Sequence, residues 1–195
     1  QSTFTQSGGV TSLASGAFSA ASANFQNGGT LQGSGTIAGN VTNSGIIAPG
    51  DGTTSHSIGD LTFTNSLTLT PTSSLLFDLG GLTSGSGFDH VQANTIALNG
   101  SLAITFANNF QTSILPSDTF ALLNTTVGSG LTGTFAGLSN GSTLFTTDGF
   151  GSFQGNYLAD SFTLSNFVPV PEPSTYALLG LGVLALAASR RRRRS

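Results

Sequence analysis

The first 60 residues carry single aliphatic side chains separated by small or amide residues. Leu31, Ile37, Val41 and Ile46 recur every 4 to 6 residues, with glycines between them. This spacing predicts short strands joined by tight corners. A parallel β-helix stacks such corners, with alternate aliphatic side chains in a narrow core. Because an isolated rung cannot bury its apolar face, we also expect an exposed first rung.

From residue 58 onward the apolar runs are longer. Most alternate with Thr, Ser, Ala or Asn, which is the period-two pattern of a half-buried strand. Asn99-Gly100 lies between two runs and indicates a hairpin or a corner. The runs fit either long solenoid rungs or a closing β-sandwich. They cover residues 61–63, 67–69, 75–79, 96–98, 102–106, 120–123, 144–145 and 162–164.

Composition agrees with an all-β protein. The chain is 37% hydrophobic with 15 Phe and is 7% charged, which is unlike a disordered sequence. Few residues are strong helix formers, so strands and turns are favoured. We therefore predict a parallel β-helix or β-solenoid body over residues 1–167, with a β-sandwich-like C-terminal part as the alternative for its end. One C-terminal hydrophobic helix follows.

Cysteine, methionine and charge narrow the function classes. The chain has no Cys, hence no disulfide, and no Met, so we expect the body to be N-terminally truncated or processed at Gln1. All five basic residues are Arg190, Arg191, Arg192, Arg193 and Arg194, so residues 1–189 hold eight acidic residues and no Lys or Arg. Without cations this stretch cannot neutralise phosphates, which excludes nucleic acid as a partner.

Residues 168–195 form a distinct tail. A Pro-rich spacer over residues 168–175 is extended by its prolines, and Ser174 or Thr175 can cap a following helix. Residues 176–189 are almost wholly apolar and predict a membrane helix, and residues 190–194 form an arginine cluster. The apolar residues that we assign to the membrane are Tyr176, Leu178, Leu179, Leu181, Val183, Leu184 and Leu186.

The length and flank of this helix predict temporary residence in a membrane. Fourteen helical residues span roughly 21 Å, against a hydrocarbon core of about 30 Å. A permanent anchor is normally longer. Arginines after an apolar run stay on the cytoplasmic side, so the rest of the chain is expected to be exported.

Three parts in this order resemble a known signal. Pro171-Glu172-Pro173, the apolar helix and the terminal Arg cluster resemble the PEP-CTERM sorting signal. That resemblance implies processing by exosortase, a membrane cysteine protease or transpeptidase of bacteria with two membranes. It also implies a precursor tethered transiently to the inner membrane, then a protein of the cell surface, biofilm matrix or medium. Pro171, Glu172 and Pro173 are the implied recognition motif.

The body resembles the C-terminal end of autotransporter-like passenger regions. The likeness is carried by residues 29–41, 43–50, 88–91 and 133–138. It implies a β-solenoid fold and says little of activity. A passenger-secreting barrel does not follow in this sequence, and the sorting tail occupies that place.

Two motifs offer candidate chemistry. Gly137-Leu-Ser139-Asn-Gly141 has the form of a nucleophile elbow, but no helical pattern follows and both histidines lie upstream, so a plain turn is favoured. Ser84 to Gln92 contains most of one calcium-binding nonapeptide, centred on Asp89. Calcium in such rolls needs tandem copies, so we expect Asp89 to cap a loop.

The remaining polar candidates have structural explanations. Glycoside hydrolysis needs two facing carboxylates, but the aspartates mostly adjoin Gly, Ser or Thr and suit turns. His56 is expected to be solvated, and His90 to point outward from a strand. The other aspartates are Asp51, Asp60, Asp78, Asp118, Asp148 and Asp160.

These observations predict an exported, non-enzymatic structural protein of the surface or the biofilm matrix, without cofactor or metal. Its expected partners are exosortase, the inner membrane through the helix for a limited time, and exopolysaccharide. Nucleic acid is not expected as a partner. The alternative is a carbohydrate-binding or carbohydrate-cleaving module that acts on exopolysaccharide.

Overall fold

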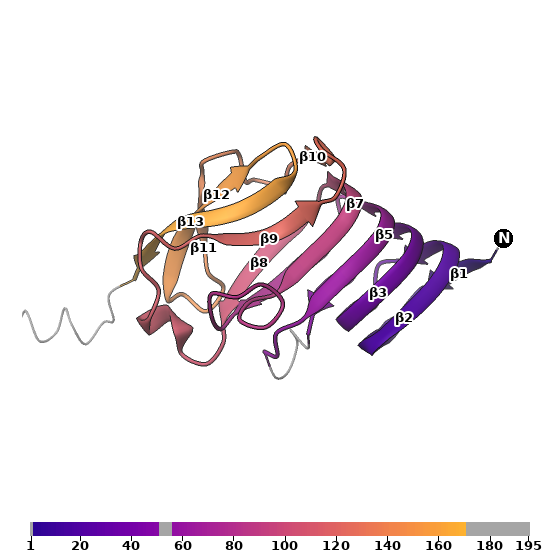
Figure 1. Ribbon diagram of the computed structural model, residues 1–195, viewed down its shortest axis with the longest axis horizontal. Helices are drawn as coiled ribbons and strands as arrows, with labels where there is room; N and C mark the ends of the chain where they lie inside the picture. The colour runs from indigo at the N-terminus through magenta and orange to yellow at the C-terminus, as the bar shows by residue number, and fades with distance from the viewer. Residues whose placement is uncertain (1, 51–55, 171–195) are drawn as a thin grey trace, which may run out of the picture.

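The computed structural model describes residues 2–50 and 56–170. Its 13 strands form one sheet that curls almost closed around a core (Figure 1). The described part is therefore all-β, as predicted, with one short 3₁₀ turn, η1 (Phe110–Thr112). The strands are β1 (Thr3–Gln6), β2 (Gly9–Phe25), β3 (Gly29–Asn43), β4 (Ile46–Pro49), β5 (Asp60–Leu69), β6 (Ser74–Leu79), β7 (His90–Leu98), β8 (Ser101–Phe106), β9 (Phe120–Thr125), β10 (Leu131–Gly133), β11 (Thr143–Phe145), β12 (Gly151–Tyr157) and β13 (Ser161–Pro169).

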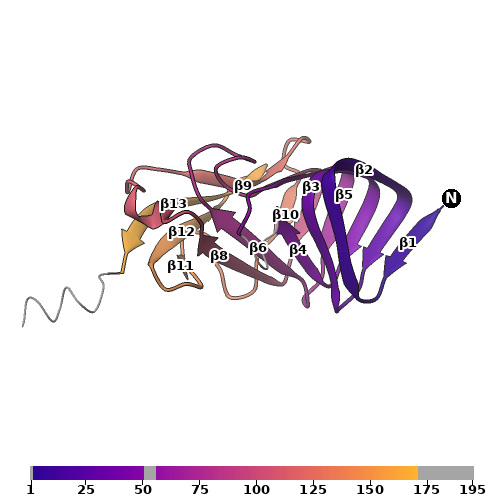
Figure 2. The same ribbon diagram turned by 90° about the horizontal axis from the view of Figure 1, so that it is seen from below.

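Parallel pairing dominates from β1 to β10. Gly9 pairs with Gly29 and Val91 pairs with Leu123, so the paired residues are 20 and 32 positions apart. The sheet divides into two branches at β3. The first residues of β3 pair with β4, and its later residues pair with β5. One branch continues through β6 and β8 (Figure 2), and the other through β7 and β9.

Register places the predicted apolar residues in columns. Residues directly opposite on neighbouring strands point to the same face of a sheet, so a column of aliphatic residues builds a continuous core. Each fully buried aliphatic side chain contributes about 1.5–3 kcal/mol. The three columns are Leu31–Ile47–Leu75, Ile37–Phe63–Ala93 and Val41–Leu67–Ile96.

Corners between the columns require glycine in β3, as Gly33 and Gly35 illustrate. Gly33 and Gly35 have φ of 99° and 152°, and a Cβ on either would lie 2.0 or 2.3 Å from a backbone oxygen of the preceding layer. The sequence predicted separate short strands here. The structure instead has one 15-residue strand that bends at these glycines.

Asn99-Gly100 forms a corner and not a hairpin. It joins β7 to β8, which pair with different strands. Gly100 has φ 72°, and a Cβ there would lie 2.2 Å from the backbone oxygen of Ser73. The tight approach between layers therefore explains this Asn-Gly pair.

The N-terminal end of the sheet is open in the described part of the chain. β1 covers residues 22–25 of β2, whereas residues 9–19 of β2 pair with β3 on one side. Val10 is 61% exposed at this end. The expected exposed first rung is thus present.

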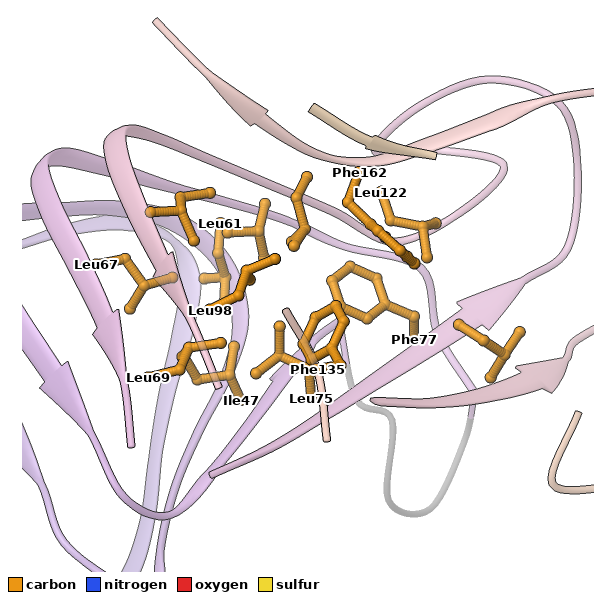
Figure 3. Packing of buried hydrophobic residues seen from close by; sticks show 14 of the residues in the cluster. Ile47, Leu61, Leu67, Leu69, Leu75, Phe77, Leu98, Leu122, Phe135 and Phe162 are labelled. Atoms are coloured by element: carbon orange, nitrogen blue, oxygen red, sulfur yellow. The ribbon is translucent and has the colours of Figure 1, made fainter. Parts of the chain in front are cut away.

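Antiparallel strands close the other end. β11, β12 and β13 pair antiparallel, and β13 joins them to β9 within the same sheet. Aromatic residues fill this end, and the rings of Phe153 and Phe167 lie 5.0 Å apart between centroids. Figure 3 shows how side chains from β4 to β13, Ile47 and Phe162 among them, gather in one interior. The N-terminal strand and the end of β13 lie at opposite ends of the long axis (Figure 1).

Candidate functional site

The last described residues tie the tail to the folded body. Gly151 pairs with Pro169, and the Val170 N–H donates to the Phe150 oxygen at 2.9 Å. The hydrogen-bonded ladder therefore reaches the residue before Pro171. Val168 and Pro169, which the sequence analysis placed in the spacer, lie at the end of β13.

Phe167 anchors this end of β13 in the core. Its side chain is 3% exposed, and its ring lies 5.6 Å from Phe106 and 5.0 Å from Phe153. Gly151, which pairs with Pro169, lies against this ring, and an added Cβ there would come within 2.3 Å of it. The absence of a side chain at residue 151 leaves room for this ring.

A cleft of about 340 Å³ opens where the chain leaves the body. It offers apolar walls and a few neutral polar groups, so it can hold an extended apolar segment. The buried Oε1 of Gln111 has no hydrogen-bond partner in the described part of the chain. The lining residues are Gln111, Thr112, Ile114, Phe150, Phe167, Pro169 and Val170.

Asp89 is a buried acid with a strongly perturbed carboxyl group. It is fully buried, and its carboxylate accepts backbone N–H bonds from Gly59 at 2.7 Å and Asp78 at 2.8 Å. Burial raises the pKa of Asp89 to about 8, although the two hydrogen bonds oppose the shift. Asp89 therefore closes the loop onto two neighbouring layers, in agreement with the predicted capping role.

Both histidines pair with aspartates near this loop. His56 Nδ1 lies 2.9 Å from Asp78 Oδ1, and His90 Nδ1 lies 3.0 Å from Asp60 Oδ1. His90 Nε2 also lies 3.2 Å from the amide oxygen of Asn124. The sequence does not reveal these pairs, because residues 22 to 34 positions apart meet only through the register of the sheet.

The exposure of the histidines differs partly from expectation. The His56 side chain is 46% exposed, which fits a solvated residue that also holds a partner. His90 as a whole is 9% exposed. We expected His90 to point outward from its strand. The side chains of Asp60 and Asn124 on the neighbouring strands contact it and leave it largely covered.

Ser139, Asp118 and Asp148 make hydrogen bonds in turns and loops. Ser139 lies in a turn, where its carbonyl accepts from the Ser142 hydroxyl at 2.6 Å. Asp148 accepts backbone N–H bonds from Phe106 at 2.7 Å and Phe150 at 3.1 Å. Asp118 accepts one from Leu115 at 2.8 Å. These hydrogen bonds give each of the three residues a structural role.

Across residues 2–50 and 56–170, no group of three or more His, Asp or Glu is placed to hold a metal ion. In the same residues, no helix has the length and apolar character needed to cross a bilayer. Several predicted functional residues lie outside the described part of the chain. They are the motif Pro171, Glu172 and Pro173, the helix over 176–189 and the arginines 190–194.

Comparison with known families decides the nature of the tail. Residues 169–193 match the model of the PEP-CTERM protein-sorting motif. The chain carries this sorting motif. No curated protein and no solved structure matches the chain, so the likeness of the body to autotransporter passengers stays an interpretation of its sequence.

The PEP-CTERM motif begins inside the folded body. Its first two residues, Pro169 and Val170, line the cleft. Pro169 ends β13, and the N–H of Val170 donates to the Phe150 oxygen. The motif implies a protein that is exported and processed at the membrane by exosortase. The predicted recognition residues 171–173 lie within the matched range.

Proposed function

We propose that this protein is an exported, non-enzymatic structural component of the cell surface or the extracellular biofilm matrix. In this proposal, the tail first tethers the body to the inner membrane. Exosortase then recognises residues 171–173 and cleaves the tail. The supporting observation is the motif match over residues 169–193, which starts where the last strand of the body ends.

The body then serves as a parallel β-helix spacer. Parallel pairing between strands 20 to 32 residues apart and the three apolar columns support this architecture. The two ends of the described chain lie at opposite ends of the long axis, as a spacer requires (Figure 1).

A polar ladder on the same strands suits contact with a hydrated polysaccharide. Thr36 is opposite Thr62, Thr62 is opposite Gln92, and Gln92 is opposite Asn124. These residues alternate with core residues such as Ile37 and Phe63, so they point away from the core. Hydroxyl and amide groups hydrogen-bond sugars without a charge. Exopolysaccharide is therefore the proposed matrix partner.

Replacing the recognition residues tests the sorting role. The Pro171→Ala, Glu172→Ala, Pro173→Ala variant is expected to stay in the inner-membrane fraction of a host that contains exosortase. The matched control Val127→Ser changes an exposed residue of the body, and it should reach the same fraction as the parent protein.

Two results would contradict the proposal. The triple variant could reach the surface or the medium as the parent does, which would remove the sorting role. Alternatively, purified protein could release reducing sugars from exopolysaccharide, which would show that the body is an enzyme.

A further inference from the structure

Large exposed apolar residues form a row across the three closing strands. Phe145 is opposite Ser152, and Ser152 is opposite Val168, so the three side chains point to one face. Phe145 is 67% exposed and Val168 is 59% exposed. Ser152, which lies between them, is small and covered. The row therefore exposes an apolar surface that β11 and β13 share.

The same row continues toward the tail. The Val170 N–H donates to the Phe150 oxygen, and these residues are 47% and 44% exposed. Val170 lies two residues beyond Val168, so in an extended chain it points to the same face. We call Phe145, Phe150, Val168 and Val170 the apolar face. Four of the nine large hydrophobic residues exposed in the described chain lie here.

The opposite face of these strands is occupied by the core. Phe153 and Phe167 alternate with the apolar face along β12 and β13 and are 1% and 3% exposed. The apolar face is thus a second apolar surface on strands that already bury one. Exposed apolar patches of this kind mark sites that meet a membrane or another molecule.

Charge near the apolar face is low. Residues 143–170 contain Asp148 and Asp160 and no Lys or Arg. Both carboxylate oxygens of Asp148 accept backbone N–H bonds, from Phe106 and Phe150. A basic patch for anionic headgroups is absent from these residues. Contact with lipid would therefore depend on apolar side chains entering the interface.

A short tether holds this face near the bilayer. Five residues, 171–175, separate Val170 from Tyr176, the first residue of the predicted membrane helix. Six Cα–Cα steps join Val170 to Tyr176, and fully extended they span at most about 22 Å. The headgroup region is roughly 5–7 Å thick on each side of the hydrocarbon core. Once the tail inserts, the end of β13 cannot move far from the lipid surface.

We propose that the apolar face lies against the lipid interface of the membrane while the tail is inserted. Lipid is favoured over a protein partner because the tether brings this face to lipid wherever the tail inserts. The contact holds the C-terminal end of the body against the lipid surface until the tail is cleaved. The inference rests on the proposed function, because it requires an inserted tail.

Site-specific fluorescence tests the contact, since the chain has no Cys and accepts a single reporter. Thr143→Cys lies two residues from Phe145 on β11, is exposed and leaves the apolar face intact. Val127→Cys is an exposed reporter outside the closing strands, and Val183→Cys reports the tail itself. Each full-length variant carries a polarity-sensitive dye and is reconstituted alone into vesicles of phosphatidylcholine and phosphatidylglycerol.

We expect the dye at residue 143 to shift its emission to shorter wavelength and to be quenched by brominated lipids, whereas the dye at residue 127 is not. Adding Phe145→Ser and Val168→Ser to the Thr143→Cys protein should abolish the quenching. Val10→Ser is a matched control at the opposite end of the molecule and should leave the quenching unchanged.

Three outcomes would overturn the inference. Quenching at residue 183 without quenching at residue 143 would refute the lipid contact and leave tail insertion intact. A shift of the dye emission at residue 143 that appears only after exosortase is added, without quenching by brominated lipids, would assign the face to a protein partner. No quenching at residue 183 would contradict tail insertion, and with it the proposed function.

Discussion

Asp89 shows how one buried acid joins two layers of the sheet. Its two oxygens each accept a backbone N–H, one from Gly59 before β5 and one from Asp78 in β6. Such bonds favour the ionised acid, but removal from water disfavours it more strongly, and the nearby Asp78 adds to the effect. Asp89 therefore holds its proton at neutral pH in the folded state.

This raised pKa predicts that stability falls as pH rises. The folded pKa of Asp89 is about 8, above the ordinary value of 3.8, so between these values the folded state holds a proton that the unfolded state has lost. The free energy of unfolding should decrease through this window, by at most about 1.4 kcal/mol per pH unit from this group, and level off above it.

Thermal unfolding at several pH values, with Asp89→Asn as the comparison, measures the effect. The variant lacks one hydrogen-bond acceptor at every pH, and this loss contributes a constant amount to its difference in stability from the parent protein. Its amide does not titrate. The difference in the free energy of unfolding between parent and variant should shrink as pH rises from 5 to 8. Parallel curves for the two proteins would show that Asp89 is ionised in the folded state.

Individual residues differ in how far the sequence predicts their contacts. The loop role of Asp89 was predicted, because a single nonapeptide offers no second turn for calcium. The His56–Asp78 and His90–Asp60 pairs were not, because their partners are 22 and 30 residues away. Only the register of parallel strands brings such residues together.

Among the elements, β13 connects the core to the sorting motif. It pairs with β9 and with β12, carries Phe167 into the aromatic end of the core, and ends at Pro169. A bulge near Asn166, which has φ 53°, separates the part that pairs with β9 from the part that leads to the tail. Phe167 lies in the second part, so one side chain fixes the exit of the tail.

Truncating Phe167 should loosen this exit. Phe167→Ala removes a buried ring and is expected to cost about 3–5 kcal/mol of stability. Val168→Ala, on the exposed face of the same strand, should change stability by no more than about 0.5 kcal/mol. Denaturant unfolding of the full-length protein in mild detergent measures both values.

Hydrogen exchange gives a local readout of the same change. The Val170 amide, which donates to Phe150, should exchange faster in Phe167→Ala than in Val168→Ala. Equal stability and equal exchange in the two variants would show that Phe167 does not anchor the strand.

Element prediction succeeded where apolar alternation was strong. The runs over 61–63, 75–79 and 102–106 lie in β5, β6 and β8. β10 and β12 were missed, since β10 has three residues and β12 mixes Gly, Gln and Asn with its aromatic residues. Their strand state comes from pairing with β7 and β13, which local pattern does not reveal.

At the scale of the whole molecule, a strand stack without Lys or Arg is joined directly to a membrane-sorting motif. The all-β class and the sorting tail followed from composition and from the order of the C-terminal segments. The antiparallel closing strands and the cleft beside Val170 depend on contacts between distant segments. The sequence therefore predicted that a tail is present, but not how closely the body abuts it.

The central claim is that exosortase removes the tail from an exported body. The most direct measurement is the intact mass of the protein recovered from two hosts that differ only in exosortase. With the enzyme, the recovered protein should lack the helix over residues 176–189 and the arginines 190–194. Without it, the full mass should persist in the membrane fraction. An unchanged full-length mass in both hosts would contradict the account.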